Sequence, residues 1–228
     1  MLEDISFEIK NQGSCAVIGP SGCGKTSLLL LLAGILQPDS GTIDIGGKPR
    51  CGTILQNYGL FPWKTVSENI GLGLTLKRVE KSKITRSVTR LLEEMELQGF
   101  GDHFPGQLSG GMQQRVALAR ALAIEPEILF MDEPLSSLDA LTRERLQNLI
   151  LDITHNRKIT TVLVTHSIEE AVFLGQKIII LSRRPGRIIE VVDNQEAGLD
   201  TYRLSDTFFR RCSTLRELLK EEFDGQKA

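Results

Sequence analysis

The octapeptide Gly19-Pro20-Ser21-Gly22-Cys23-Gly24-Lys25-Thr26 decides the fold expected of this chain. An apolar run, Ser14-Cys15-Ala16-Val17-Ile18, precedes it, and a leucine-rich stretch of helical character (26–35) follows it directly. A glycine-rich loop between a strand and a helix is the context in which this spacing binds phosphate, because glycines let backbone N–H groups turn inward. The helix N-terminus adds partial positive charge. The sequence therefore predicts an α/β nucleotide-binding fold.

The side chains at the end of this loop have the chemistry that a nucleotide needs. Lys25 can reach the β- and γ-phosphates, and the Thr26 hydroxyl can ligate Mg²⁺. We take the loop and the next residue, Ser27, as the nucleotide-binding residues. The alternative is a glycine-rich turn with a surface lysine, which the strand–loop–helix context disfavours.

Two carboxylates follow an apolar run, Ile128-Leu129-Phe130-Met131, that reads as a buried strand. Asp132 would hold Mg²⁺ through water at the sheet edge. In an extended chain Glu133 would point the other way, where its carboxylate could orient or deprotonate the water that attacks the γ-phosphate. The alternative is an acidic turn before Pro134.

Two further polar residues follow predicted strands. Gln56 comes just after a short strand (53–55), and its amide could bind Mg²⁺ or the attacking water. His166 follows a β-branched strand (161–165) and could hydrogen-bond the γ-phosphate and the water. The alternatives are a polar strand end for Gln56 and a helix-capping turn for His166.

The stretch Ser109-Gly110-Gly111 opens a predicted helix (111–124). Ser109 can cap this helix, and the free N–H groups at its start form a second anion site. This site lies far along the chain from Lys25, and one nucleotide already has its phosphate loop. Its simplest use is to bind the nucleotide of a neighbouring subunit.

Strands and helices alternate along most of the chain, which indicates one layered α/β domain spanning residues 1–228. A mainly helical stretch (60–124) is the candidate for an inserted lobe, and residues 194–228 form a short tail with a final amphipathic helix. The remaining predictions are helices at 84–95, 140–154 and 168–174 and strands at 177–182 and 188–192.

Bulk composition narrows the class of protein. The 228 residues are 41% hydrophobic and 25% charged, as in soluble globular proteins, and the net charge of -2 gives no general attraction to nucleic acid. The longest apolar run, 28–36, is short for a membrane span, and the N-terminus lacks a signal pattern. Four scattered cysteines are expected to be reduced thiols of a cytosolic protein, so a membrane role would come through a partner.

Taken together, these motifs resemble those of ATP-binding cassette (ABC) transporter ATPases over nearly the whole chain. The resemblance implies a P-loop NTPase with a RecA-like core, an antiparallel β subdomain and a helical subdomain. It also implies Mg²⁺-dependent ATP hydrolysis in a head-to-tail dimer, with ATP between the phosphate loop and the opposing signature helix. In that pattern Leu108–Gln113 is the signature, and Ser137-Leu138-Asp139 is the loop that contributes Asp139 to the nucleotide site.

Shorter stretches resemble the nitrate/sulfonate/taurine-type importer ATPases, among them Tyr58-Gly59-Leu60-Phe61-Pro62-Trp63 and Ser182-Arg183-Arg184-Pro185-Gly186-Arg187-Ile188. Met112 departs from the commonest signature, which has glutamine there. Relatives usually carry one more strand before Leu2, with an aromatic residue that stacks on adenine.

The resemblance also implies partners at the cytoplasmic face of a membrane. We expect integral membrane permease subunits to dock on the segment from Asn57 to Thr65, with a solute-binding protein acting through them. The partner ATPase would be a second copy or a paired subunit. The sequence favours neither of two roles for the aromatic residues Tyr58, Phe61 and Trp63, which are interface anchors or core residues.

Two other functions compete with this one. A non-transport ABC ATPase usually has coiled-coil insertions, tandem cassettes or basic surfaces. A small-molecule kinase does not need Ser109–Gly111.

Overall fold

The computed structural model describes residues 2–136, 138–199 and 201–224, with side chains as far as residue 220. Its centre is a six-stranded sheet in the order β2-β3-β4-β1-β5-β6. Every neighbouring pair is parallel except β5 and β6. The strands are β1 (Ser14–Ile18), β2 (Cys51–Ile54), β3 (Ile128–Asp132), β4 (Thr160–Val164), β5 (Lys177–Leu181) and β6 (Ile188–Asp193).

The central strands are buried on both faces, which explains why they read as continuous apolar runs. Along β1, Ala16 and Ile18 belong to one hydrophobic cluster, while Cys15 and Val17 belong to the other. Successive side chains of a strand point to opposite faces, so the two clusters lie on the two sides of the sheet. A chain with this pattern forms a layered α/β sandwich.

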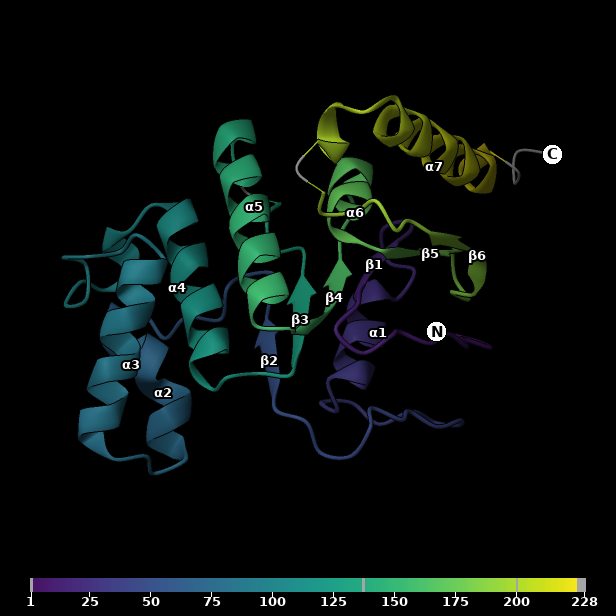
Figure 1. Cartoon of the computed structure of the whole chain (residues 1–228). Helices are drawn as coiled ribbons and strands as arrows, with labels where there is room; N and C mark the ends of the chain where they lie inside the picture. Colours follow the sequence, from purple (N-terminus) through teal and green to yellow (C-terminus); the bar gives the residue numbers. More distant parts are fainter. Residues whose placement is uncertain (1, 137, 200, 225–228) are drawn as a thin grey trace.

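Helices cover both faces (Figure 1). One face carries α1 (Lys25–Leu32), whose Leu28 and Leu29 pack with Phe130 and Val162. The other face carries α5 (Ala140–Asn156) and α6 (Ile168–Leu174), and α7 (Asp206–Asp224) lies against α6 after a short 3-10 turn, η2 (Tyr202–Leu204). No helix of the described residues combines the length and apolarity needed to cross a bilayer.

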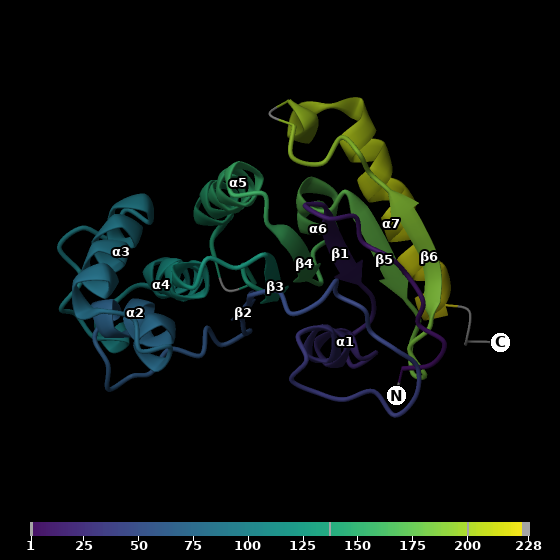
Figure 2. The same cartoon turned by 60° about the horizontal axis from the view of Figure 1, so that its bottom comes forward.

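Three helices pack together beside the β2 edge of the sheet, where Figures 1 and 2 show them as a separate group. They are α2 (Val66–Leu76), α3 (Lys81–Glu94) and α4 (Gly110–Ala123), with the 3-10 turn η1 (Pro105–Gln107) before α4. Helix α4 contacts β2 as well as α2 and α3. These helices lie within the stretch 60–124 that the sequence marks as an inserted lobe.

A buried asparagine fixes the segment that leads into this group. The Asn69 side chain has no exposed surface. Its amide nitrogen donates to the carbonyls of Phe61, Lys64 and Thr65 at 3.0–3.1 Å, and its oxygen accepts from the Phe61 N–H at 2.9 Å. Loss of these bonds would leave buried polar groups unpaired. Asn69 therefore gives residues 61–65 a defined shape.

The mixed sheet with helices on both faces confirms the predicted α/β P-loop fold. The extent of antiparallel structure differs from the expectation, because antiparallel pairing in the described part of the chain is limited to β5 and β6. Residues 35–50 form no strand here, and this stretch contains Gly41, Gly46 and Gly47 in left-handed conformations. Glycines with positive φ interrupt extended backbone, which is a physical reason why this stretch forms no strand.

Candidate functional site

The register of the parallel strands brings the predicted site residues to one edge of the sheet. Asp132 pairs with Val164 across β3 and β4, and Val17 pairs with Val164 across β1 and β4. The phosphate loop, Glu133 and His166 each follow the last residues of one of these strands. Chain segments more than 100 residues apart therefore meet at the carboxyl ends of three neighbouring strands.

The phosphate loop has the conformation that its glycines were expected to allow. Gly19, Gly22 and Gly24 have φ values of 157°, 76° and 114°. Lys25 is buried, and its ammonium donates to the Gly19 and Pro20 carbonyls, each at 2.9 Å. The lysine therefore points back into the loop, where bound phosphate oxygens would replace these carbonyls as its acceptors.

The other loop residues differ in exposure. Ser21 and Thr26 are exposed, Ser27 is half-buried and Cys23 faces the core. The loop therefore offers its backbone and the Thr26 side chain to a ligand, while the buried Cys23 side chain anchors the loop to the core.

The turn between β5 and β6 supports the phosphate loop from the side. A Cβ placed on Gly186 would lie 2.4 Å from the Cys23 carbonyl oxygen, so only glycine fits there without displacing the loop. The Arg184 guanidinium donates to the Gly22 carbonyl at 2.8 Å. The sequence does not show that the turn at Pro185-Gly186 touches the loop, because the two segments are far apart along the chain.

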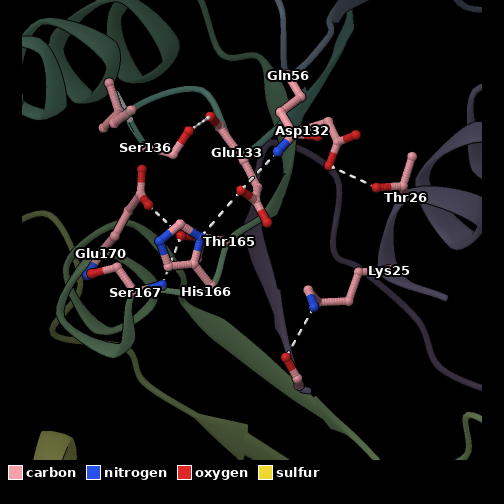
Figure 3. Close-up of polar contacts among 12 residues, drawn as sticks. Lys25, Thr26, Gln56, Asp132, Glu133, Ser136, Thr165, His166, Ser167 and Glu170 are labelled. Carbon is pink, nitrogen blue, oxygen red and sulfur yellow. Dashed lines mark hydrogen bonds and ion pairs between the residues drawn. The ribbon is translucent and has the colours of Figure 1, made fainter. Parts of the chain in front are cut away.

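Thr26 and Asp132 form the candidate metal site (Figure 3). The Thr26 hydroxyl donates to an Asp132 carboxylate oxygen at 3.2 Å. Asp132 is buried, and this burial is the main cause that raises its pKa; the Thr26 hydrogen bond acts in the opposite direction. A hydroxyl and a carboxylate at the phosphate loop are hard oxygen donors, and they fit Mg²⁺ that shares its other positions with phosphate and water.

Glu133 lies between Gln56 and His166 (Figure 3). One of its carboxylate oxygens accepts from the Gln56 amide at 3.2 Å and lies 3.1 Å from Nδ1 of His166. The three side chains predicted to act on the attacking water are therefore in direct contact. A carboxylate fixed by an amide and an imidazole can orient and deprotonate a water molecule.

The expectation of an extended backbone at Glu133 is wrong. Its φ is 46°, in the left-handed region, and its N–H donates to the Val164 carbonyl at 2.8 Å. Strand β3 ends at Asp132, so the chain turns at Glu133 and swings its carboxylate toward β4 and His166. The strained conformation of a non-glycine residue is typical of functional sites.

The predicted second anion site lies at the start of α4. The Ser109 hydroxyl accepts from the Met112 N–H at 3.3 Å, so Ser109 caps the helix as predicted, and a Cβ on Gly110 would meet nothing within 4 Å. Asp139 caps α5 by accepting from the Thr142 N–H at 3.0 Å, and this contact lowers the Asp139 pKa. The two helix starts are adjacent, because a Cβ on Gly111 would lie 3.0 Å from the Thr142 methyl group.

Neither helix start reaches the phosphate loop of its own chain: the described residues show no hydrogen bond or ion pair from Ser109–Gly111 or Asp139 to the loop. Ser137, the first residue of the predicted Ser137-Leu138-Asp139 loop, lies outside the described residues.

Replacement of Gly186 tests the support of the phosphate loop. Gly186→Ala should push the loop away from Cys23 and weaken ATP binding by about tenfold or more, the usual scale of overpacking. The matched control is Gly106→Ala, where an added Cβ meets nothing within 4 Å. Fluorescent-nucleotide titration of both variants is the measurement, and equal affinities would contradict the proposed contact.

The chain is similar to known cassette ATPases. Residues 2–136 match the family model described as ABC transporter. The chain is 47% identical to the taurine import ATP-binding protein TauB of Pelagibacter ubique, over 82% of this chain and 73% of the relative. It is 43% identical to an uncharacterized ABC transporter ATP-binding protein of Methanocaldococcus jannaschii, over 97% of this chain and 85% of the relative.

A solved structure gives the same result. The dimeric ATP-binding cassette MJ0796, in a post-hydrolysis state bound to ADP and Pi, superposes with a TM-score of 0.76 at 31% identity, covering 84% of this chain and 90% of that one. The chain therefore belongs to the ABC transporter family, as an ATP-binding and ATP-hydrolysing cassette.

Proposed function

We propose that this chain is the energy-coupling subunit of an ABC importer and hydrolyses ATP to drive solute uptake through separate membrane subunits. The observation that carries the chemistry is Glu133, held between Gln56 and His166 at the edge that also bears the phosphate loop. The import role is supported by relatives named for import, among them TauB and, at 44% identity, a probable sulfate/thiosulfate import protein of Chlorella vulgaris.

Each site residue has a role in this reaction. The backbone of residues 19–27 and the Lys25 ammonium bind the phosphates. Thr26, Asp132 and Gln56 would hold Mg²⁺, which neutralises phosphate charge when bound. Glu133 accepts the proton of the attacking water. Gln56 and His166 fix the Glu133 carboxylate and lie on the side of the site that faces the γ-phosphate.

A complete site requires two chains. The N-terminus of α4, opened by Ser109, Gly110 and Gly111, is an exposed anion site, and Asp139 lies beside it. We propose that this surface binds the nucleotide held by the phosphate loop of the partner, which is a second copy or a paired ATPase subunit. The dimeric state of the MJ0796 cassette supports this arrangement.

We propose that the whole chain is one ABC ATPase domain with a helical subdomain at about 60–124 and a C-terminal tail from about 194. It would work at the cytoplasmic face of the membrane, with permease subunits that receive solute from a solute-binding protein. The net charge of -2 supports an assembly without nucleic acid.

We propose that the permease subunits dock on the segment from Asn57 to Thr65. Trp63 has 70% of its surface exposed and its ring contacts that of Phe61 edge-on, while Tyr58 is half-buried against the core. Arg120 fixes the segment by donating to the Tyr58 and Gly59 carbonyls, as Asn69 does at its other end. An exposed aromatic residue on a fixed segment favours an interface role for Trp63.

Substitution of Glu133 and Lys25 separates chemistry from binding. Glu133→Gln should retain ATP binding while turnover falls by about 10²-fold or more, the scale of losing a general base. Lys25→Ala should abolish or greatly weaken nucleotide binding itself. Titration with ATP and a phosphate-release assay measure both, and wild-type turnover in Glu133→Gln would refute its assignment as the base.

ATP should promote dimers, most clearly in Glu133→Gln, where the ligand is not consumed. Mixing a Lys25→Ala chain with a Ser109→Arg chain should restore activity, because each mixed dimer contains one intact composite site. Sedimentation with and without ATP measures the first effect and phosphate release the second. A strictly monomeric Glu133→Gln chain at saturating ATP would contradict the shared site.

Trp63→Ala should leave folding and basal ATPase activity intact but uncouple transport in reconstituted membranes. The matched substitution Tyr58→Ala removes a side chain that packs on the core, so it should lower the thermal midpoint instead. Thermal melting, ATPase rate and uptake are compared for both variants. Unchanged transport by Trp63→Ala would remove this residue from the docking site.

A further inference from the structure

A buried carboxylate lies behind the site histidine. Glu170, in the first turn of α6, is 3% exposed. One carboxylate oxygen accepts from the Thr165 hydroxyl, and the other, Oε1, is buried with no hydrogen-bond partner among the described residues. The Thr165 oxygen in turn accepts from the Ser167 N–H at 3.0 Å. The residues on both sides of His166 are thus tied to Glu170 (Figure 3).

The charged groups that act on Glu170 come from three separate segments of the chain. They are Arg143 on α5, His166 before α6 and Glu133 after β3. Burial raises the pKa of Glu170 to about 7, while Thr165, Arg143 and His166 favour the ionised carboxylate and Glu133 opposes it. The Glu170 carboxyl therefore changes charge near neutral pH, and it lies next to Thr165, the residue before His166.

Arg143 links Glu170 electrostatically to the segment that leads to Asp139. Its guanidinium donates to the Leu138 carbonyl at 2.7 Å and to the Leu135 carbonyl at 3.4 Å. Leu138 directly precedes Asp139, the residue that caps α5 beside the second anion site. The cation that stabilises the Glu170 carboxylate thus also fixes the backbone leading to Asp139.

Packing alone does not explain a carboxylate at this position. A buried carboxylate with a free oxygen costs free energy, and a glutamine of the same shape would accept the Thr165 bond without burying a charge. Buried groups that reduce stability but connect two parts of a site are expected to serve the activity.

We propose that Glu170 is a positioning residue of the hydrolysis site. Through Thr165 and Ser167 it holds His166 against Glu133. Through Arg143 it couples this position of His166 to the backbone before Asp139. This inference rests on the proposed ATPase function. The ionised carboxylate attracts the Arg143 guanidinium, so the coupling is present above about pH 7 and is lost as the pH falls and Glu170 is protonated.

The test compares Glu170→Gln, Arg143→Met and the double variant with the wild type. The matched control is Glu169→Gln, an exposed neighbour in the same helix turn that pairs with Arg216 on α7. ATP affinity, ATP turnover between pH 6 and pH 8.5, and thermal midpoint are measured for each chain. Glu170→Asp, which keeps the charge, provides the rescue variant.

Glu170→Gln should keep the thermal midpoint and bind ATP within about twofold of wild type, while turnover falls about tenfold, because misplaced groups cost rate rather than affinity. The rise of wild-type turnover between pH 6 and 8 should flatten in Glu170→Gln and persist in Glu169→Gln. Glu170→Asp should regain part of the turnover and of the pH dependence. The double variant should be no slower than the slower single variant, since both substitutions remove the same electrostatic interaction between Glu170 and Arg143.

Three results would overturn the inference. The first is wild-type turnover and pH profile in Glu170→Gln, and the second is a multiplicative loss in the double variant. The third is loss of turnover only in parallel with thermal stability, in both Glu170→Gln and Arg143→Met. A wild-type chain without ATPase activity would instead contradict the proposed function, so the two failures are distinguishable.

Discussion

The alignment of three parallel strands is the constraint on which the site depends. Strands β3, β4 and β1 are in register such that Asp132, Val164 and Val17 lie in one row across the sheet. Each strand then delivers a different group at the same edge: Glu133 after β3, His166 after β4 and the phosphate loop after β1. A shift by one residue would exchange the two faces of a strand and separate these groups, so core packing and chemistry are fixed together.

The phosphate loop is prepared for an anion before one arrives. Lys25 is satisfied by two carbonyls of its own loop, and the loop is supported by Gly186 and Arg184 from the β5–β6 turn. A charge already buried and oriented loses little conformational entropy when phosphate replaces the carbonyls. The pair of Thr26 and Asp132 is likewise already in contact, so binding requires few rearrangements on this side of the site.

Much of this site could be predicted from the sequence because its groups follow strands at recognisable spacing. Lys25, Asp132 and His166 are found in this way, and the contact between Glu133 and Gln56 agrees with their expected shared role. The sequence could not show which distant segments support these residues. Gly186 lies against Cys23 only after β5 has paired with β1, and Arg143 stabilises Glu170 only after α5 and α6 have packed on the sheet.

The backbone at Glu133 shows a second limit. Alternation along a strand predicts where Asp132 points, but the strand ends there and the next residue adopts φ of 46°. Local pattern cannot predict such a conformation, because it is imposed by the Val164 carbonyl on the neighbouring strand. The limited antiparallel pairing has a more local origin: residues 35–50 form no strand, and Gly41, Gly46 and Gly47 in this stretch adopt positive φ.

The most direct measurement of the central claim is an experimental structure of this chain with Mg²⁺ and a non-hydrolysable ATP analogue. We expect the Lys25 ammonium to have left the Gly19 and Pro20 carbonyls and to lie about 3 Å from phosphate oxygens. Thr26 and Asp132 should lie at the metal, and Glu133 should face the γ-phosphate. An analogue bound elsewhere, with Lys25 still on its own carbonyls, would contradict the assignment of this edge as the ATP site.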